Sequence, residues 1–242
     1  MPSARYQPSA LLFDMGGVVI DVDFDRAFHA WQPRSKLSFS EIRRTFRTDC
    51  VYRSHERGEI SARQYYDHLS ALLQLERDYD YIEAGWNAIY VGEISETIAL
   101  LQTARSVIQC FAFTNTNSAH AATWRRLFPS VVQSFDGVFA SHEIGLRKPE
   151  RSAFDYVARA IGISPESIVF FDDLAENLQG RPMRDFEAYT SAAHAMFESH
   201  FNRSAVRSDS GARGGFCQAG PRGTCARSAS MRSAAVVNKD RL

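Results

Sequence analysis

The amino-acid sequence predicts an α/β protein in which a doubly wound parallel sheet carries a small helical module inserted after its first strand. Three observations lead to this fold class. Short apolar runs recur along the chain and are typical of strands buried on both faces of a parallel sheet. Helical patterns separate the later runs. The first connection, from Phe13 to Val107, spans over ninety residues without a convincing strand.

The elements of the expected sheet follow in chain order. Four runs are expected to form its strands: Ala10–Phe13, Val107–Phe113, Gly137–Ala140 and Ile168–Phe171. Two helices are expected between the later runs, because apolar residues recur at helical spacing in two sets: Ile94, Ile98 and Leu101, and Phe154, Val157, Ala158 and Ile161. Strands that alternate with helices in this way indicate a doubly wound sheet.

The long first connection is expected to be helical, around Glu41–Tyr52, Ser61–Leu75 and Tyr81–Tyr90. Ser61 followed by Gln64 is a capping box, which marks the start of the middle helix. The insert follows strand one at the carboxyl edge of the sheet, where open α/β sheets bind ligands. We therefore expect it to act as a lid over that edge.

The chain has 242 residues, 45% of them hydrophobic, which is enough for one core and an insert. We expect residues 1–24 and 92–201 to form the α/β core and residues 25–91 the helical cap. Residues 202–242 carry seven arginines and one lysine against two aspartates, with a single aromatic residue, so a disordered basic tail is expected. Before it, Pro182 is tolerated only in the first turn of a helix, Asp185 is a poor residue for a helix C-cap, and Phe186–Ser191 is only a weak strand, which predicts a poorly supported edge.

Composition argues against several classes of partner. The formal net charge is zero, so the chain as a whole has no general attraction for nucleic acid or an anionic membrane, and the basic tail is a weak exception. No apolar run approaches the roughly 18 residues that a membrane span needs. The four cysteines lack zinc-type spacing and suit a reducing compartment, so a cytoplasmic location is expected. The sequence gives no indication of oligomeric state.

A polar group of a different type follows each predicted strand. These groups are Asp14, Thr114 with Asn115, Lys148 before Pro149, and Asp172 with Asp173 and then Asn177. Because the carboxyl ends of parallel strands meet at one edge, we expect these side chains to converge. Several carboxylates together need a cation such as Mg²⁺, and a lysine neutralises what charge is left. A hydroxyl and backbone amides beside them form a phosphate cradle in which a carboxylate can attack phosphorus.

Four motifs in this order resemble the haloacid dehalogenase-like hydrolase superfamily: "LLFDMGGVV", "FAFTNTN", "GLRKPE" and "VFFDDLAEN". The helical insert resembles the small helical cap of that superfamily. Within it, "FDMGGVVIDVDF" and "HERGEIS" are most similar to the branch that contains α-D-glucose-1-phosphate phosphatase. The resemblance implies a Mg²⁺-dependent phosphatase that acts on a small phosphorylated metabolite, such as glucose 1-phosphate, through an aspartyl-phosphate.

The resemblance also implies roles for the residues that contact the phosphoryl group. Asp14 would be the nucleophile, and Lys148 would pair with Asp14 and the phosphate. Thr114 and Asn115 would hold the phosphoryl group.

For the metal, the resemblance implies Asp14 and the backbone carbonyl of Met15 as ligands. Asp173 is the favoured ligand from the last motif and Asp172 the second candidate. Asn177 would support them through a hydrogen bond or a water molecule.

Gly16 departs from the superfamily pattern, because phosphatases of this superfamily usually carry a second Asp at that position. That Asp protonates the leaving oxygen, a task worth roughly 10²–10⁴ in rate. Three explanations stay open. The enzyme relies on easily lost leaving groups or on another acid, and the glucose-1-phosphate branch also has glycine here. Alternatively, the chain is a halide-displacing dehalogenase, although the paired acids of the last motif argue against this. The third explanation is an inactive binding domain.

Asp21, Asp23 and Asp25 are candidates for a substitute acid, because their spacing places them on one face of an extended segment, although a solvated hinge is the favoured interpretation. His55, Glu56 and Arg57 are expected in a polar loop of the cap and are candidates for recognising the sugar or leaving group, with a turn at Gly58.

Four other residues are expected to have structural roles. Trp86 and Tyr90 are more often cap core than sugar platforms, and His120 and Trp124 are expected to be structural.

Overall fold

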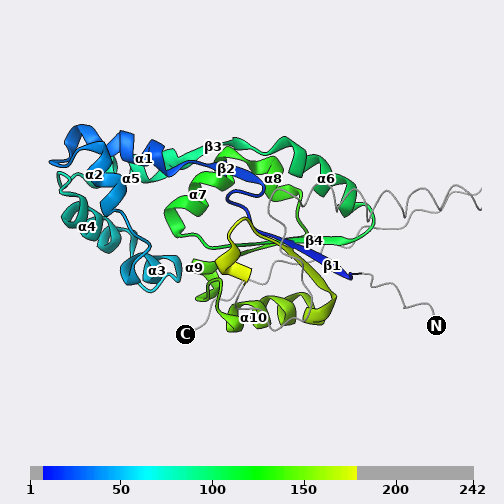
Figure 1. Ribbon diagram of the computed structural model, residues 1–242. Helices are drawn as coiled ribbons and strands as arrows, with labels where there is room; N and C mark the ends of the chain where they lie inside the picture. Colours follow the sequence, from blue (N-terminus) through cyan, green and yellow to red (C-terminus); the bar gives the residue numbers. More distant parts are fainter. Residues whose placement is uncertain (1–7, 179–242) are drawn as a thin grey trace, which may run out of the picture.

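The computed structural model describes residues 8–178 of the 242. Four parallel strands form the main sheet in the order β5-β4-β1-β6. Their bounds are β1 Ala10–Phe13, β4 Gln109–Thr114, β5 Gly137–Ala140 and β6 Ile168–Phe171. Helices cover both faces of this sheet (Figure 1), which confirms the predicted α/β fold with a parallel sheet. The second strand begins two residues later than predicted, because Val107 is 72% exposed in the turn before it.

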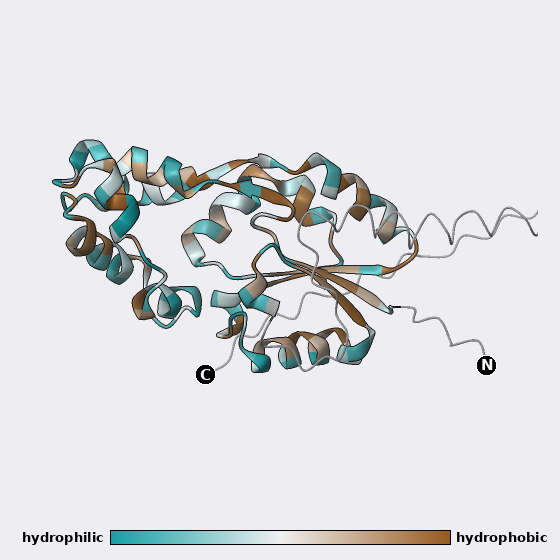
Figure 2. Ribbon diagram, viewed as in Figure 1, coloured by the Kyte–Doolittle hydropathy of each residue, from teal (hydrophilic) through white to brown (hydrophobic). Residues whose placement is uncertain are grey.

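Alternate residues of β1 serve two separate cores. Phe13 packs into a cluster with Trp124, on the face covered by α6, α7 and α8, and Leu12 packs with Phe154 of α10 on the other face. The helices are α6 Ser95–Arg105, α7 Ser118–Leu127, α8 Pro129–Gln133, α9 Ser141–Ile144 and α10 Arg151–Ile161. The strands between the two layers are mostly brown, hence hydrophobic, in Figure 2. A sheet buried on both faces in this way leaves its carboxyl edge for polar residues.

A group of helices lies together at the carboxyl edge of the sheet (Figure 1), and we call this group the cap. They are α1 Phe24–Trp31, α2 Phe39–Thr45, α3 Cys50–Glu56, α4 Ala62–Leu73 and α5 Tyr79–Trp86, with 3₁₀ turns at Gln32–Arg34 and Asn87–Ile89. The cap has its own core, in which Trp31 and Trp86 stack with ring centroids 6.1 Å apart. We propose that it is the inserted domain expected at residues 25–91.

The connection to the cap contains strands that the sequence analysis did not predict. β2, Ile20–Val22, pairs antiparallel with β3, Tyr90–Glu93, and this ribbon carries the chain into the cap and back. The expectation of a first connection without strands is therefore wrong. Three or four residues are too few for an alternating pattern to stand out from the surrounding loop.

The predicted cap helices need similar adjustment. The single helix expected at Glu41–Tyr52 is two helices, because Asp49 caps a new helix by accepting the Tyr52 amide at 2.9 Å. The capping box at Ser61 is confirmed. The helix that it starts ends at Leu73, where Gln74 takes a left-handed backbone conformation.

Several predictions fall outside the described residues, and the structure does not bear on them. They concern Pro182, Asp185, the strand at 186–191, and the tail 202–242 with Cys217 and Cys225. Among the helices of residues 8–178, none has the length and apolar character to cross a membrane.

Candidate active site

Asp14 and Lys148 form the centre of the site, directly beyond the carboxyl end of β1. The Asp14 amide donates to the Phe171 carbonyl of β6, which continues the sheet pairing to this residue. The Lys148 side chain is fully buried, and its Nζ lies 2.9 Å from Asp14 Oδ1 and 2.6 Å from Asp172 Oδ2. Burial lowers the pKa of the Lys148 ammonium, but the two carboxylates raise it more, so it stays above its usual value.

The two acids after β6 have different surroundings. Asp172 is fully buried and accepts hydrogen bonds from Lys148, from the Leu174 amide and, through both oxygens, from Asn177 Nδ2 at 2.9 and 3.0 Å. Asp173 is exposed and lines the cavity in front of Asp14. Asp172 is therefore occupied as the partner of Lys148, while Asp173 is available to a ligand.

The acidic group fits a divalent cation. One oxygen from each of Asp14, Asp172 and Asp173 lies within 4.8 Å of the others. Three carboxylates around one ammonium leave excess negative charge. Burial raises the pKa of Asp14 to about 7, against the opposing effect of Lys148 and with a further increase from Asp172. A hard cation with oxygen ligands would relieve this excess, which is the chemistry of Mg²⁺.

The two glycines of the first motif play different parts. Gly17 has φ +73°, and a Cβ there would overlap the Asp173 carboxylate, so this position needs glycine on both counts. Gly16 lies outside the positive-φ region, and a Cβ on it would meet Val22 Cγ2 at an ordinary 3.6 Å. Nothing in the backbone at Gly16 therefore excludes a side chain.

The Met15 carbonyl, which the family resemblance implied as a metal ligand, is engaged in hydrogen bonds within its own turn. It accepts hydrogen bonds from the amides of Val19 and Ile20 at 2.9 and 2.8 Å, so its two lone pairs are used within the turn. The Gly16 carbonyl has no such donor among the described residues, and Gly16 lines the cavity.

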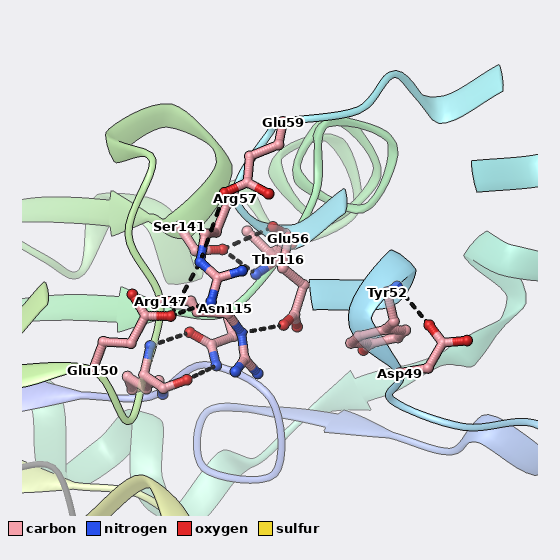
Figure 3. Close-up of polar contacts among 11 residues, drawn as sticks. Asp49, Tyr52, Glu56, Arg57, Glu59, Asn115, Thr116, Ser141, Arg147 and Glu150 are labelled. Atoms are coloured by element: carbon pink, nitrogen blue, oxygen red, sulfur yellow. Dashed lines mark hydrogen bonds and ion pairs between the residues drawn. The ribbon is translucent and has the colours of Figure 1, made fainter. Parts of the chain in front are cut away.

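The second motif also divides its tasks. Thr114 is buried and lines the cavity, and its contact with the phosphoryl group stays a prediction. The Asn115 side chain instead holds the backbone of Lys148: its Nδ2 donates to the Lys148 carbonyl at 3.0 Å and its Oδ1 accepts the Lys148 amide at 2.8 Å. Ser141 makes the same reciprocal contact with the backbone of Thr116, both at 2.8 Å (Figure 3). Asn115 thus lies beside the cavity mainly as a support for Lys148.

A cavity of about 580 Å³ lies between this sheet edge and the cap. The sheet contributes Asp14, Gly16, Thr114 and Asp173, and the cap contributes Tyr52 and Glu56, among other residues. Lys148 and Asp172 lie beneath this lining. The cavity is large enough for a small metabolite, and Asp14 and Asp173 of the acidic group line it.

Comparison with known proteins agrees with this geometry. A family model of the haloacid dehalogenase-like hydrolases matches residues 8–180. The chain belongs to this family. It is 26% identical over 187 residues to phosphatase MT3486 of Mycobacterium tuberculosis, covering 75% of this chain and 86% of that protein. It is 20% identical over 184 residues to D-ribitol-5-phosphate phosphatase of Bacteroides thetaiotaomicron, covering 74% and 89%.

A solved structure gives a similar result. A haloacid dehalogenase family enzyme of Bacteroides thetaiotaomicron, in complex with magnesium and inorganic phosphate, matches with a TM-score of 0.64 at 26% identity, covering 78% of this chain and 98% of that one. The predicted family and the prediction of a hydrolase are confirmed. The glucose-1-phosphate branch is not singled out by these relatives.

In this haloacid dehalogenase-like hydrolase, the side chains of the three cap residues predicted to recognise the substrate, His55, Glu56 and Arg57, contact different surroundings. They lie at the end of α3, not in a loop as predicted, because the helix begins at its Asp49 cap and continues to Glu56. Only Glu56 lines the cavity. His55 is buried against Tyr65, with ring centroids 4.3 Å apart, and Arg57 turns to Glu150 of the core.

Asp21, Asp23 and Asp25 do not face the cavity of the hydrolase. Asp21 is exposed, Asp23 caps α1, and Asp25 pairs with Arg43 at 3.1 Å. The alternation expected from the sequence is present, but Val22 and Phe24 are the residues that face inward. The favoured interpretation of a solvated segment agrees with this placement.

Sequence analysis missed some residues that line the cavity. Arg147, directly before Lys148, reaches both the cavity and Glu56, and its position in "GLRKPE" was the available signal. Tyr52 also lines the cavity, where burial and then Glu56 raise the pKa of its hydroxyl well above the usual value. Tyr90 and His120 line it as well, whereas Trp86 is buried in the cap core as expected.

Proposed function

We propose that this chain is a Mg²⁺-dependent phosphatase that hydrolyses a small phosphorylated metabolite through an aspartyl-phosphate on Asp14. One observation carries the proposal: Asp14 lines a 580 Å³ cavity, with Lys148 Nζ 2.9 Å from its Oδ1 and the carboxylates of Asp172 and Asp173 grouped around it. The phosphatase names of two relatives and the magnesium and phosphate bound in a related structure support it.

The chain's own residues supply the steps of the reaction. An oxygen of Asp14 attacks phosphorus, the bond from phosphorus to the ester oxygen breaks, and that oxygen leaves with the bond's electron pair and takes a proton. Water then attacks the phosphorus of the acyl phosphate, which releases inorganic phosphate and restores the Asp14 carboxylate. Lys148 offsets the negative charge of Asp14 and the phosphoryl oxygens, and Thr114 orients the phosphoryl group.

Asp14 and Asp173 would hold the metal, together with the Gly16 carbonyl in place of the Met15 carbonyl. Asp172 would support them from beneath through its bond to Lys148. When bound, Mg²⁺ supplies positive charge that offsets the carboxylates and the phosphoryl oxygens.

The absence of an acid at Gly16 favours substrates whose leaving oxygen needs little protonation, such as an anomeric sugar phosphate. Of the acids that line the cavity besides Asp14, Asp173 is available to the metal, Glu56 is paired with Arg147, and Glu176 is exposed to solvent. We therefore propose a sugar phosphate such as glucose 1-phosphate as the substrate class. A cytoplasmic location and the absence of nucleic-acid partners stay predictions.

The test is a release assay on a panel of sugar phosphates and 2-haloacids, with Mg²⁺ and with EDTA. Phosphate release that requires Mg²⁺ and is lost in Asp14→Asn is the expected result. Asp21→Asn is the matched control, because Asp21 is an exposed acid outside the cavity. Its activity should equal that of the natural sequence.

Two outcomes would overturn the proposal. Halide release that EDTA does not affect would identify a dehalogenase. Mg²⁺ binding without turnover of any compound in the panel would identify a binding domain.

A further inference from the structure

Two ion pairs connect the cap to the loop that carries Lys148. Glu56, the last residue of α3, accepts a hydrogen bond from Arg147 Nε at 2.7 Å. Arg57, the next residue, pairs with Glu150, with its Nε 3.1 Å from Oε1. The charges are crossed, since the cap contributes an acid and then a base while the loop contributes a base and then an acid. Figure 3 shows both contacts at the meeting of α3 with this loop.

Burial makes these contacts more than surface ion pairs. The side chains of Arg147 and Glu56 are only 12% and 6% exposed, and those of Arg57 and Glu150 are 24% and 31% exposed. A buried charge that loses its partner is strongly unfavourable. Withdrawal of α3 from the core would break both pairs and lose their attraction, which the low exposure of Glu56 and Arg147 makes stronger than that of a pair in water.

The two loop residues flank Lys148 closely. Arg147 precedes it, Glu150 follows Pro149, and the Glu150 amide donates to the Arg147 carbonyl at 3.0 Å, which closes a turn around the lysine. On the other side, Asn115 binds the Lys148 amide and carbonyl. The Lys148 backbone is thus held from the sheet by Asn115 and from the cap through its two neighbours.

A glycine contact marks the same interface independently. Gly58 has φ +69°, and a Cβ on it would come within 2.6 Å of the His142 carbonyl of α9. The chain after α3 therefore approaches the core backbone more closely than a larger residue permits.

We propose that Glu56 and Arg57 of the cap are positioning residues for Lys148, which they hold in register with Asp14 and Asp172 through Arg147 and Glu150. This rests on the proposed function only in its effect on turnover. Its structural part, that α3 orders the loop 145–150, can be measured without substrate.

The experiment is a charge exchange at the more exposed pair. Arg57→Glu and Glu150→Arg are prepared singly and together. Hydrogen–deuterium exchange of loop 145–150 is followed in each, together with kcat and KM for p-nitrophenyl phosphate with Mg²⁺. Each single variant should exchange faster in the loop and lose roughly tenfold in kcat, with less change in KM. The double variant should return to within about threefold of the natural kcat and recover loop protection.

Arg34→Glu is the matched control, because Arg34 pairs with Asp78 at 2.7 Å within the cap and does not touch the loop. It should leave loop exchange and kcat unchanged. Single variants that keep the natural loop exchange would overturn the proposal, as would a folded double variant with no recovery. Glu56→Gln, which keeps the shape of the buried pair, should also speed loop exchange. If the natural chain releases no phosphate from any substrate, the proposed function fails while the exchange measurement still decides this inference.

Discussion

The sheet side and the cap side of the cavity are held in different ways. On the sheet side, buried charges satisfy one another: Lys148 lies between Asp14 and Asp172. On the cap side, polar atoms are left over. The three buried side-chain atoms without a hydrogen-bond partner among the described residues are His55 Nε2, Asn87 Oδ1 and His142 Nδ1, all in the cap or in α9 beside it. The sheet side is thus fixed by mutual charge, whereas the cap side is held by packing and ion pairs at its contact with the core.

The largest effect is expected from removing the central charge of the sheet side. Lys148→Met keeps most of the side-chain volume but leaves Asp14 and Asp172 buried without their cation. We expect a loss of about 3–5 kcal/mol in the free energy of unfolding, the cost of breaking a buried ion pair. Urea unfolding measured at pH 7 tests this. Lys36→Met, at an exposed position, is the control, and a loss no larger in Lys148→Met than in this control would show that the charges do not fix the sheet side.

On the cap side, we expect instead a pH dependence of the free energy of unfolding. His55 is buried, and desolvation first, then His142, lowers its pKa to about 4. Between the usual value of 6.5 and about 4, the unfolded chain binds a proton that the folded His55 does not. The contribution of His55 to the free energy of unfolding is therefore fully present above pH 6.5. It falls by about 3 kcal/mol in total as the pH drops towards 4.

His55→Phe keeps a ring against Tyr65 and should flatten this slope when unfolding is measured from pH 6.5 to 4.5. Two other histidines lie near His55: burial first lowers the pKa values of His142 of α9 and His120 of α7, and His55 also lowers that of His120, so the slope from these two groups remains largely in place in His55→Phe. His29→Phe is the control, since His29 is an exposed histidine that stacks on Phe39 at 4.1 Å. An unchanged slope in His55→Phe would contradict the prediction.

A smaller effect, on Mg²⁺ affinity, is expected at the proposed metal site of the sheet side. Gly17→Ala places a Cβ against the Asp173 carboxylate at a position with φ +73°. We expect displacement of Asp173 and a loss of roughly tenfold or more in Mg²⁺ affinity, measured by calorimetry. Gly162→Ala is closely matched, because Gly162 has the same φ but nothing within 4 Å of its Cβ. Equal Mg²⁺ affinity in the two variants would contradict this prediction and mean that Gly17 is needed only for its positive φ, not to leave room for the Asp173 carboxylate.

The same contrast explains how far the sequence could be interpreted. The sheet side was predictable because parallel topology brings strand ends together, so Asp14, Thr114, Lys148 and Asp173 converge once the strands are recognised. The cap side was not, because helical spacing does not indicate how a helix is rotated against a distant partner. Glu56 faces the cavity while its neighbours turn away, and only tertiary packing decides this. Hydrogen bonds to backbone, such as those of Asn115, likewise leave no spacing signal.

The smallest effect is expected at Gly16, where the sheet side has room for an added acid that the proposed reaction does not require. A Cβ there meets only Val22 at 3.6 Å, so Gly16→Asp should fold. We expect it to raise kcat/KM roughly tenfold for aryl phosphates with poor leaving groups and to leave good ones unchanged, because an added acid helps only where protonation limits the rate. The measurement is the slope of log kcat/KM against leaving-group pKa. Gly16→Asn has the same shape without the proton and should keep the natural slope. If Gly16→Asp also keeps it, then another group already protonates the leaving oxygen, and the cap-side hydroxyl of Tyr52 becomes the next residue to vary.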